Sequence, residues 1–147
     1  MKTIYSEDHR KHFPQGELFG GEFVTPFERP SRVEFILSAL KAAGMTDISA
    51  PGGVDMAPVK RIHDAAYLEF LETCWAAWMD MGHRGEILPT CFPARRMQQR
   101  IPNDIEGKIG YYSLGVETAI TAGTWEAALS SCATVQAAQA LVAGGER

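Results

Sequence analysis

The stretch IHDAAYLEFL, residues 62–71, decides how the middle of the chain folds. In it, His63 and Asp64 stand side by side just before apolar residues at helical spacing. Such a pair fits a catalytic dyad, part of a metal site or a junction between two helices. An aspartate at this position can accept hydrogen bonds from the free N–H groups of the first helical turn. We therefore predict that His63 closes one helix and that Asp64 caps the next, which runs to about Met81 along a stripe of Leu68, Leu71, Trp75 and Trp78.

Upstream of this stretch, residue types predict two short strands and one clear helix. Residues 2–6 (KTIYS) and 47–50 (DISA) favour strands, whereas the Pro- and Gly-rich residues from 7 to 26 predict a long polar loop. A helix is expected from about residue 31 to Gly44, with Ser31 and Glu34 as a capping box. Its apolar residues form one predicted buried stripe: Val33, Ile36, Leu37 and Leu40. Asp55 is positioned to cap a short helix that ends at Ile62.

The second half of the chain predicts one irregular region and one long helix. Residues 82–113 contain three prolines and are expected to be irregular. Within them, the basic run at 94–100 (ARRMQQR) fits an anion site or a solvated loop, and the solvated loop is preferred. Small residues dominate 124–143, which predicts a closely packed helix that ends before Gly144.

Composition excludes several classes of protein. The 147 residues are 46% hydrophobic, enough for one ordinary core, and 18 acidic residues outnumber 14 basic ones. This balance argues against binding to nucleic acid, which needs clustered positive charge. No apolar run reaches the length of a membrane span, and the first residues are polar. The cysteines (Cys74, Cys91, Cys132) lack metal or disulfide spacing, so we expect a reduced, cytoplasmic protein.

The chemistry visible in the residues is sparse. The four histidines (9, 12, 63 and 83) form no metal-spaced cluster, and no nucleophile elbow or phosphate-binding loop is present. Helices outnumber strands, which is typical of part of an α/β domain rather than a complete one. The residues alone thus indicate an α/β chain without an assignable reaction.

Several segments nevertheless resemble a known family. ELFGGEFVTPFERPSR, IHDAAYLEFLE, FPARRM, IPNDIEGKIGYY and ITAGTWEAALSS are similar to acetylpolyamine amidohydrolases, bacterial members of the zinc-dependent histone deacetylase superfamily. The resemblance runs from Met1 to Gly145. It implies the N-terminal part of an arginase-like, three-layer αβα fold with a parallel sheet.

The resemblance also implies a reaction, but not its catalytic residues. Members of the family use zinc to hydrolyse an acetamide on a cationic chain. Their tandem histidines, zinc ligands and tyrosine come after the long small-residue helix, which places them beyond residue 147. No catalytic or metal-binding residue is therefore assigned in 1–147, and the chain alone is expected to be inactive.

Substrate-facing residues can be carried over from the resemblance. Glu17, in the segment ELFGG, and Glu106, in IPNDIEG, are expected to attract the ammonium groups of an acetylated polyamine. Phe19 beside Glu17 is expected to form an apolar or cation–π wall, with a role as a loop anchor as the alternative. The resemblance further implies that residues 82–113 form an inserted loop at a homo-oligomer contact.

Three hypotheses for function follow. The first is the N-terminal part of an acetylpolyamine deacetylase, truncated before the catalytic histidines, with exposed apolar helix faces. The second is a non-catalytic interaction protein that pairs with a full-length deacetylase through 82–113. The third, least favoured, is an independent enzyme that uses His63 and Asp64.

Overall fold

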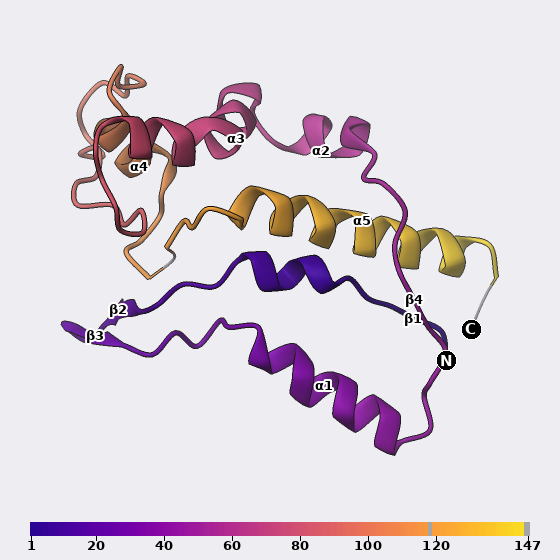
Figure 1. Ribbon diagram of the computed structural model, residues 1–147. Helices are drawn as coiled ribbons and strands as arrows, with labels where there is room; N and C mark the ends of the chain where they lie inside the picture. The colour runs from indigo at the N-terminus through magenta and orange to yellow at the C-terminus, as the bar shows by residue number, and fades with distance from the viewer. Residues whose placement is uncertain (118, 146–147) are drawn as a thin grey trace. The chain divides into compact units, whose positions relative to one another are not determined.

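The computed structural model describes residues 1–117 and 119–145, which form two compact units (Figure 1). The first unit contains residues 1–13, 28–62 and those from 123 onward. The second contains residues 14–27 and 63–122. Within the described ranges, no helix is both long and apolar enough to cross a membrane.

A parallel pair of short strands lies in the first unit. Strand β1 (Thr3–Ile4) pairs with β4 (Ile48–Ser49), with Thr3 opposite Ile48. The Tyr5 N–H extends the ladder by donating to the Ser49 carbonyl at 2.9 Å. Both predicted strands are present, and their parallel pairing across a helix confirms the α/β class.

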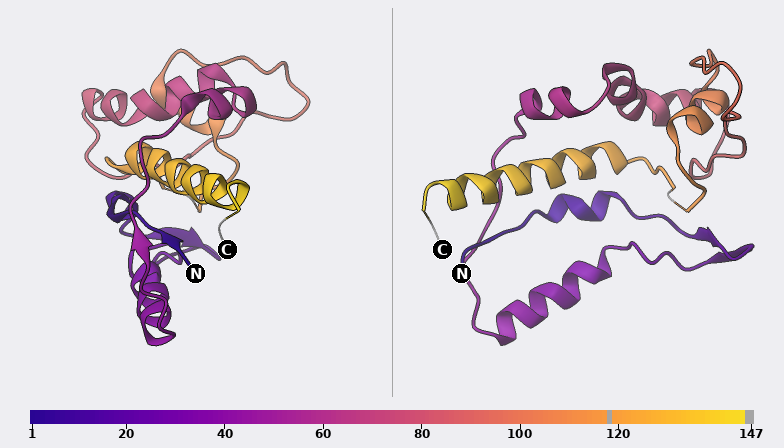
Figure 2. Two further views of the ribbon diagram at one scale, coloured as in Figure 1. Left: turned by 90° about the vertical axis from the view of Figure 1, so that its right-hand side faces the viewer. Right: turned by 180° about the vertical axis from the view of Figure 1, so that it is seen from behind.

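The long helix α5 (Thr124–Ala143) has the predicted bounds. It packs on β1 and on the 3₁₀ helix η1 (Glu7–Lys11), which lies in the polar segment predicted as loop. Both views in Figure 2 show η1 alongside α5. A Cβ at Gly123 would lie 2.5 Å from the Lys11 carbonyl oxygen, so this approach requires glycine.

Helix α1 (Ser31–Ala42) differs from its prediction in its cap and in its burial. Pro30 occupies the N-cap position and no side chain caps the helix, so the predicted capping box is wrong. Glu34 forms an ion pair with Arg10 of η1 instead. The predicted buried stripe is also wrong: no α1 residue is buried, and of the stripe Val33, Leu37 and Leu40 are half-buried and Ile36 is 54% exposed.

Asp55, just before helix α2 (Met56–Ile62), forms hydrogen bonds both to α2 and to α5. The Ala57 N–H donates to the Asp55 carboxylate at 2.9 Å, which confirms the predicted cap. The Gln136 side chain of α5 accepts from the Asp55 N–H at 2.9 Å and donates to the Asp55 carbonyl at 2.8 Å. These bonds position α2 within the first unit.

The His63–Asp64 pair immediately precedes helix α3 (Ala65–Asp80), and Asp64 occupies its N-cap position. The Asp64 carboxylate accepts from the N–H groups of Ala66, at 2.8 Å, and Tyr67, at 3.3 Å. The His63 ring lies against Tyr67, with the ring centres 5.9 Å apart. The predicted helix junction is confirmed.

We expect Asp64→Ala to lower the free energy of unfolding by about 1 kcal/mol, because the first turn of α3 loses its acceptor. Asp64→Ser should retain most of this stability, since serine also caps. The check is urea unfolding followed by fluorescence of Trp75 and Trp78, with Trp125 replaced by phenylalanine. Asp80→Ala, at the other end of α3, is the matched control. Equal losses for Asp64→Ala and Asp80→Ala would contradict the capping role.

The core of the second unit lies between α3 and α4 (Ile105–Tyr112). Its buried members are Phe70, Cys74, Ile87, Ile105 and Ile109. The predicted stripe of α3 is only partly buried. Helix α4 packs instead against the adjacent face of α3, which carries the buried residues Phe70 and Cys74. The prediction that residues 82–113 are irregular throughout is wrong for α4, which Asp104 caps by accepting from the Gly107 N–H at 2.7 Å.

A β-hairpin occupies part of the segment predicted as loop. Strand β2 (Glu17–Phe19) pairs antiparallel with β3 (Glu22–Val24). Gly20 and Gly21 join them with φ angles of 61° and 86°, the conformation of a tight two-residue hairpin turn. The hairpin positions two of the predicted substrate-facing residues.

Candidate functional site

All three predicted substrate-facing residues lie in the second unit, and two of them share a strand. Glu17 is 8% exposed, and the Phe27 N–H donates to its Oε2 at 3.2 Å. Phe19, two residues along β2 and so on the same face, is exposed. Its ring meets that of Phe27 edge-on, with centres 5.5 Å apart. Phe27 therefore joins Glu17 and Phe19 into one small structure at the hairpin.

Glu106 lies in the first turn of α4, where the helix dipole favours negative charge. Its side chain is 56% exposed, and Oε1 lies 3.3 Å from His83 Nε2. Among the described residues, no hydrogen bond, ion pair or ring contact joins Glu106 to Glu17 or Phe19. The structure thus presents an accessible carboxylate on α4 and a separate acidic–aromatic hairpin.

No sequence pattern predicts that His83 lies beside Glu106. The His83 ring stacks on Trp78, with ring centres 3.6 Å apart and planes at 15°. Trp78 is itself fixed, because its Nε1–H donates to the Gly85 carbonyl at 2.9 Å. Gly82 reverses the chain at a φ of 91° and so returns His83 to α3. That glycine after the last turn of α3 was the only available signal for this contact.

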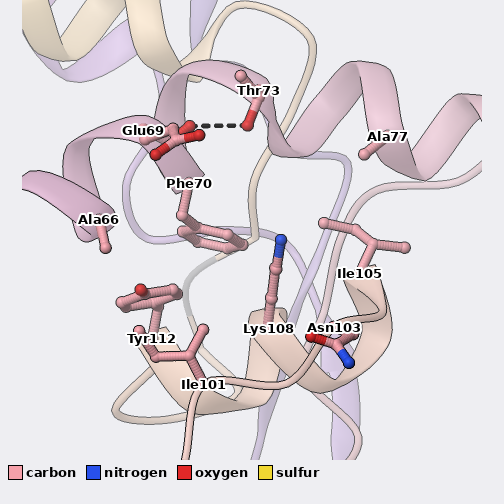
Figure 3. A pocket seen from close by; sticks show the side chains of 10 residues that line it. All are labelled: Ala66, Glu69, Phe70, Thr73, Ala77, Ile101, Asn103, Ile105, Lys108 and Tyr112. Atoms are coloured by element: carbon pink, nitrogen blue, oxygen red, sulfur yellow. Dashed lines mark hydrogen bonds between the residues drawn. The ribbon is translucent and has the colours of Figure 1, made fainter.

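A cavity of about 250 Å³ lies between α3 and α4 (Figure 3). Phe70, Ile105 and Tyr112 supply apolar surface, and Glu69 and Lys108 supply charge. In Figure 3, Lys108 extends from α4 toward α3. The Thr73 hydroxyl donates to the Glu69 backbone carbonyl at 2.7 Å and therefore does not engage the carboxylate.

The cavity offers a phenol hydroxyl beside its charged groups. Burial, followed by the negative charge of Asp64, raises the pKa of the Tyr112 hydroxyl above its ordinary value. Tyr112 therefore stays protonated at neutral pH and can donate a hydrogen bond. The ten lining residues include one carboxylate, Glu69, and one ammonium group, Lys108, and no histidine, cysteine or aspartate.

The zinc implied by the resemblance has no suitable donors in the described residues. No three His, Cys, Asp or Glu side chains within 1–117 and 119–145 lie close enough to hold a metal ion. The three cysteines are unpaired. Burial raises the pKa of the Cys74 thiol to about 11, so this core residue stays a neutral thiol.

The basic run at 94–100 is an exposed loop, as preferred from the sequence. Its polar side chains bond mainly within the run: the Gln99 amide donates to the carbonyls of Ala94 and Met97. Arg100 donates to the Gln98 side chain at 3.1 Å. This segment therefore has the contacts of a solvated loop.

Comparison with known proteins supports the resemblance. The chain is 51% identical over 147 residues to the acetylpolyamine amidohydrolase of Mycoplana ramosa, and 40% identical over 147 residues to acetylpolyamine amidohydrolase 2 of Pseudomonas aeruginosa. Each match covers the whole chain and 43% of the relative. No protein-family model matches. The chain thus spans less than half the length of the curated relatives it matches.

The fold agrees with a solved structure. The crystal structure of an acetylpolyamine aminohydrolase from Burkholderia pseudomallei matches with a TM-score of 0.85 at 27% identity. The match covers 99% of this chain and 42% of that one. It confirms the predicted fold, the N-terminal part of a deacetylase-like α/β domain.

Proposed function

Because the chain is homologous along its whole length to acetylpolyamine amidohydrolases, we propose that it is the N-terminal part of an enzyme that deacetylates acetylated polyamines. The observation that carries this proposal is the 51% identity over all 147 residues. In the proposed reaction, water adds to the acetamide carbonyl, the C–N bond breaks, and acetate and a free amine form. We further propose a cytoplasmic location, in keeping with three unpaired cysteines.

In this proposal the chain contributes substrate recognition and no catalytic residue. The accessible Glu106 carboxylate attracts the ammonium groups of the polyamine. Phe19 offers an exposed ring to a cation at the hairpin. Glu17 has one oxygen engaged by Phe27, and its second oxygen can accept from an ammonium group. The zinc expected in the family is assigned to another part of the whole protein, since the side chains of residues 1–117 and 119–145 supply no group of three donors.

A chimera tests this proposal. Residues 1–147 replace the matching 43% of the Mycoplana ramosa enzyme, and release of acetate from acetylspermidine is measured. We expect an active chimera and no activity from the 147-residue chain alone. Glu106→Gln in the chimera should raise KM about threefold with little change in kcat, because an attraction common to substrate and transition state is lost.

Glu72→Gln is the matched control for this experiment, since Glu72 is an exposed carboxylate on α3. A folded but inactive chimera would overturn the enzymatic proposal. Equal KM changes in Glu106→Gln and Glu72→Gln would overturn the role of Glu106 alone.

The second candidate is a non-catalytic protein that pairs with a full-length deacetylase through residues 82–113. Exposed apolar side chains in this segment favour it: Phe92, Met97 and Ile101. An inactive chimera, together with co-elution of the chain and the intact relative in size-exclusion chromatography, would support this alternative. The same segment is our proposed contact for a homo-oligomer.

A further inference from the structure

The cluster of Trp78, His83 and Glu106 joins the end of α3 to the start of α4. His83 lies between an aromatic face at 3.6 Å and a carboxylate oxygen at 3.3 Å. Its Nε2 atom is inaccessible to solvent and forms no hydrogen bond to any described residue. The imidazole is therefore held beside Glu106 by its stacking on Trp78, with no directional bond that fixes the pair.

Two groups that attract positive charge flank the ring of His83. A carboxylate at ion-pair distance attracts an imidazolium, and the face of an indole attracts a cation. Arg84 donates to the backbone carbonyl of His83 at 2.7 Å. Histidine is the side chain whose charge ordinarily changes between about pH 5 and 8.

The carboxylate in this pair is also the one exposed to incoming cations. Glu106 is 56% exposed, whereas the His83 side chain is 32% exposed and backed by Trp78. An ammonium group can therefore approach Glu106 from solvent while His83 stays in place. The two cations compete for one carboxylate, and His83 competes only when it carries a proton.

We propose that His83 is a specificity-determining residue that sets how strongly Glu106 attracts a polyamine. Protonated His83 neutralises Glu106 and weakens the attraction. Neutral His83 leaves the full carboxylate charge to the ammonium groups of the ligand. This inference rests on the proposed function only in taking a polyamine as the ligand of Glu106.

The test measures binding of spermidine to the 147-residue chain by isothermal titration calorimetry at pH 5.5 and pH 8.0. For the native chain we expect a Kd about three- to fivefold lower at pH 8.0, the effect of one partly exposed ion pair. The His83→Gln variant should bind spermidine equally at both pH values, with the Kd that the native chain shows at pH 8.0. The His83→Arg variant carries a permanent charge and should bind spermidine equally at both pH values, with the Kd that the native chain shows at pH 5.5.

His63→Arg is the matched control, because it adds the same charge at a histidine that contacts Tyr67 and not Glu106. This control should keep the pH dependence of the native chain. If Glu106→Gln binds spermidine as tightly as the native chain, Glu106 is not the polyamine site and that part of the proposed function fails. If Glu106→Gln weakens binding but His83→Gln and His83→Arg match the native chain, the role of His83 alone is overturned.

Discussion

Phe70→Ala is expected to lower the free energy of unfolding of the second unit by about 3 kcal/mol. Phe70 is 5% exposed and packs with Cys74, Ile87, Ile105 and Ile109. Its ring also stacks on Tyr112, with centres 4.8 Å apart. The substitution removes this surface and enlarges the cavity between α3 and α4, which Phe70 already lines.

Urea unfolding followed by fluorescence of Trp75 and Trp78 measures this loss, in the chain that carries Trp125→Phe. Both reporters pack against the cluster that contains Phe70. Phe92→Ala is the matched control, because Phe92 lies in the same unit and is 45% exposed. A loss for Phe70→Ala no larger than that for Phe92→Ala would show that the α3–α4 core does not stabilise the unit.

Gly110→Ala should lower the free energy of unfolding by a similar amount, because it adds a methyl group where there is no space for one. Gly110 is buried in α4, and a Cβ there would lie 1.8 Å from the Cys91 carbonyl oxygen and 2.9 Å from its carbon. The obstacle is backbone, which cannot move aside by changing a rotamer. We expect a loss of about 3 kcal/mol, although alanine favours a helix interior over glycine by about 1 kcal/mol.

The same fluorescence measurement applies to Gly110→Ala. Gly85→Ala is its control: the added methyl group would meet nothing within 4 Å, and the residue lies in the same unit. Gly85→Ala is expected to change stability by less than about 0.5 kcal/mol. A Gly110 variant that is as stable as the native chain would mean that Cys91 is not held against α4.

The elements that could be predicted from sequence were those with local signals. Asp64 and Asp55 cap helices through N–H groups two or three residues away, and Gly144 follows the last residue of α5. Such contacts need no knowledge of the rest of the fold. The burial of α1 required that knowledge, and there the prediction of an apolar stripe was wrong.

The missed elements have weaker local signals. Helix α4 contains two glycines and only eight residues, and its stability comes from packing against α3. The β2–β3 hairpin has three-residue strands, so the pair Gly20-Gly21 was its only strong indication. Packing between distant segments stabilises short elements of this kind, and the pattern of residues within them does not reveal it.

The resemblance supplied candidate residues but not their surroundings. It pointed to Glu17, Phe19 and Glu106, for which we propose a role in polyamine recognition. The contact of Glu106 with His83 joins residues that are far apart in sequence and depends on the turn at Gly82. No spacing rule predicts such a pair, because the intervening segment is irregular.

The order of the segments along the chain has a consequence for synthesis on the ribosome. The first unit begins at the N-terminus, yet β1 and η1 pack on α5, which is translated only after the whole of the second unit. The second unit is complete once residue 122 has emerged. Its α3–α4 core can therefore form during translation while the parallel strand pair still waits for the helix that covers it.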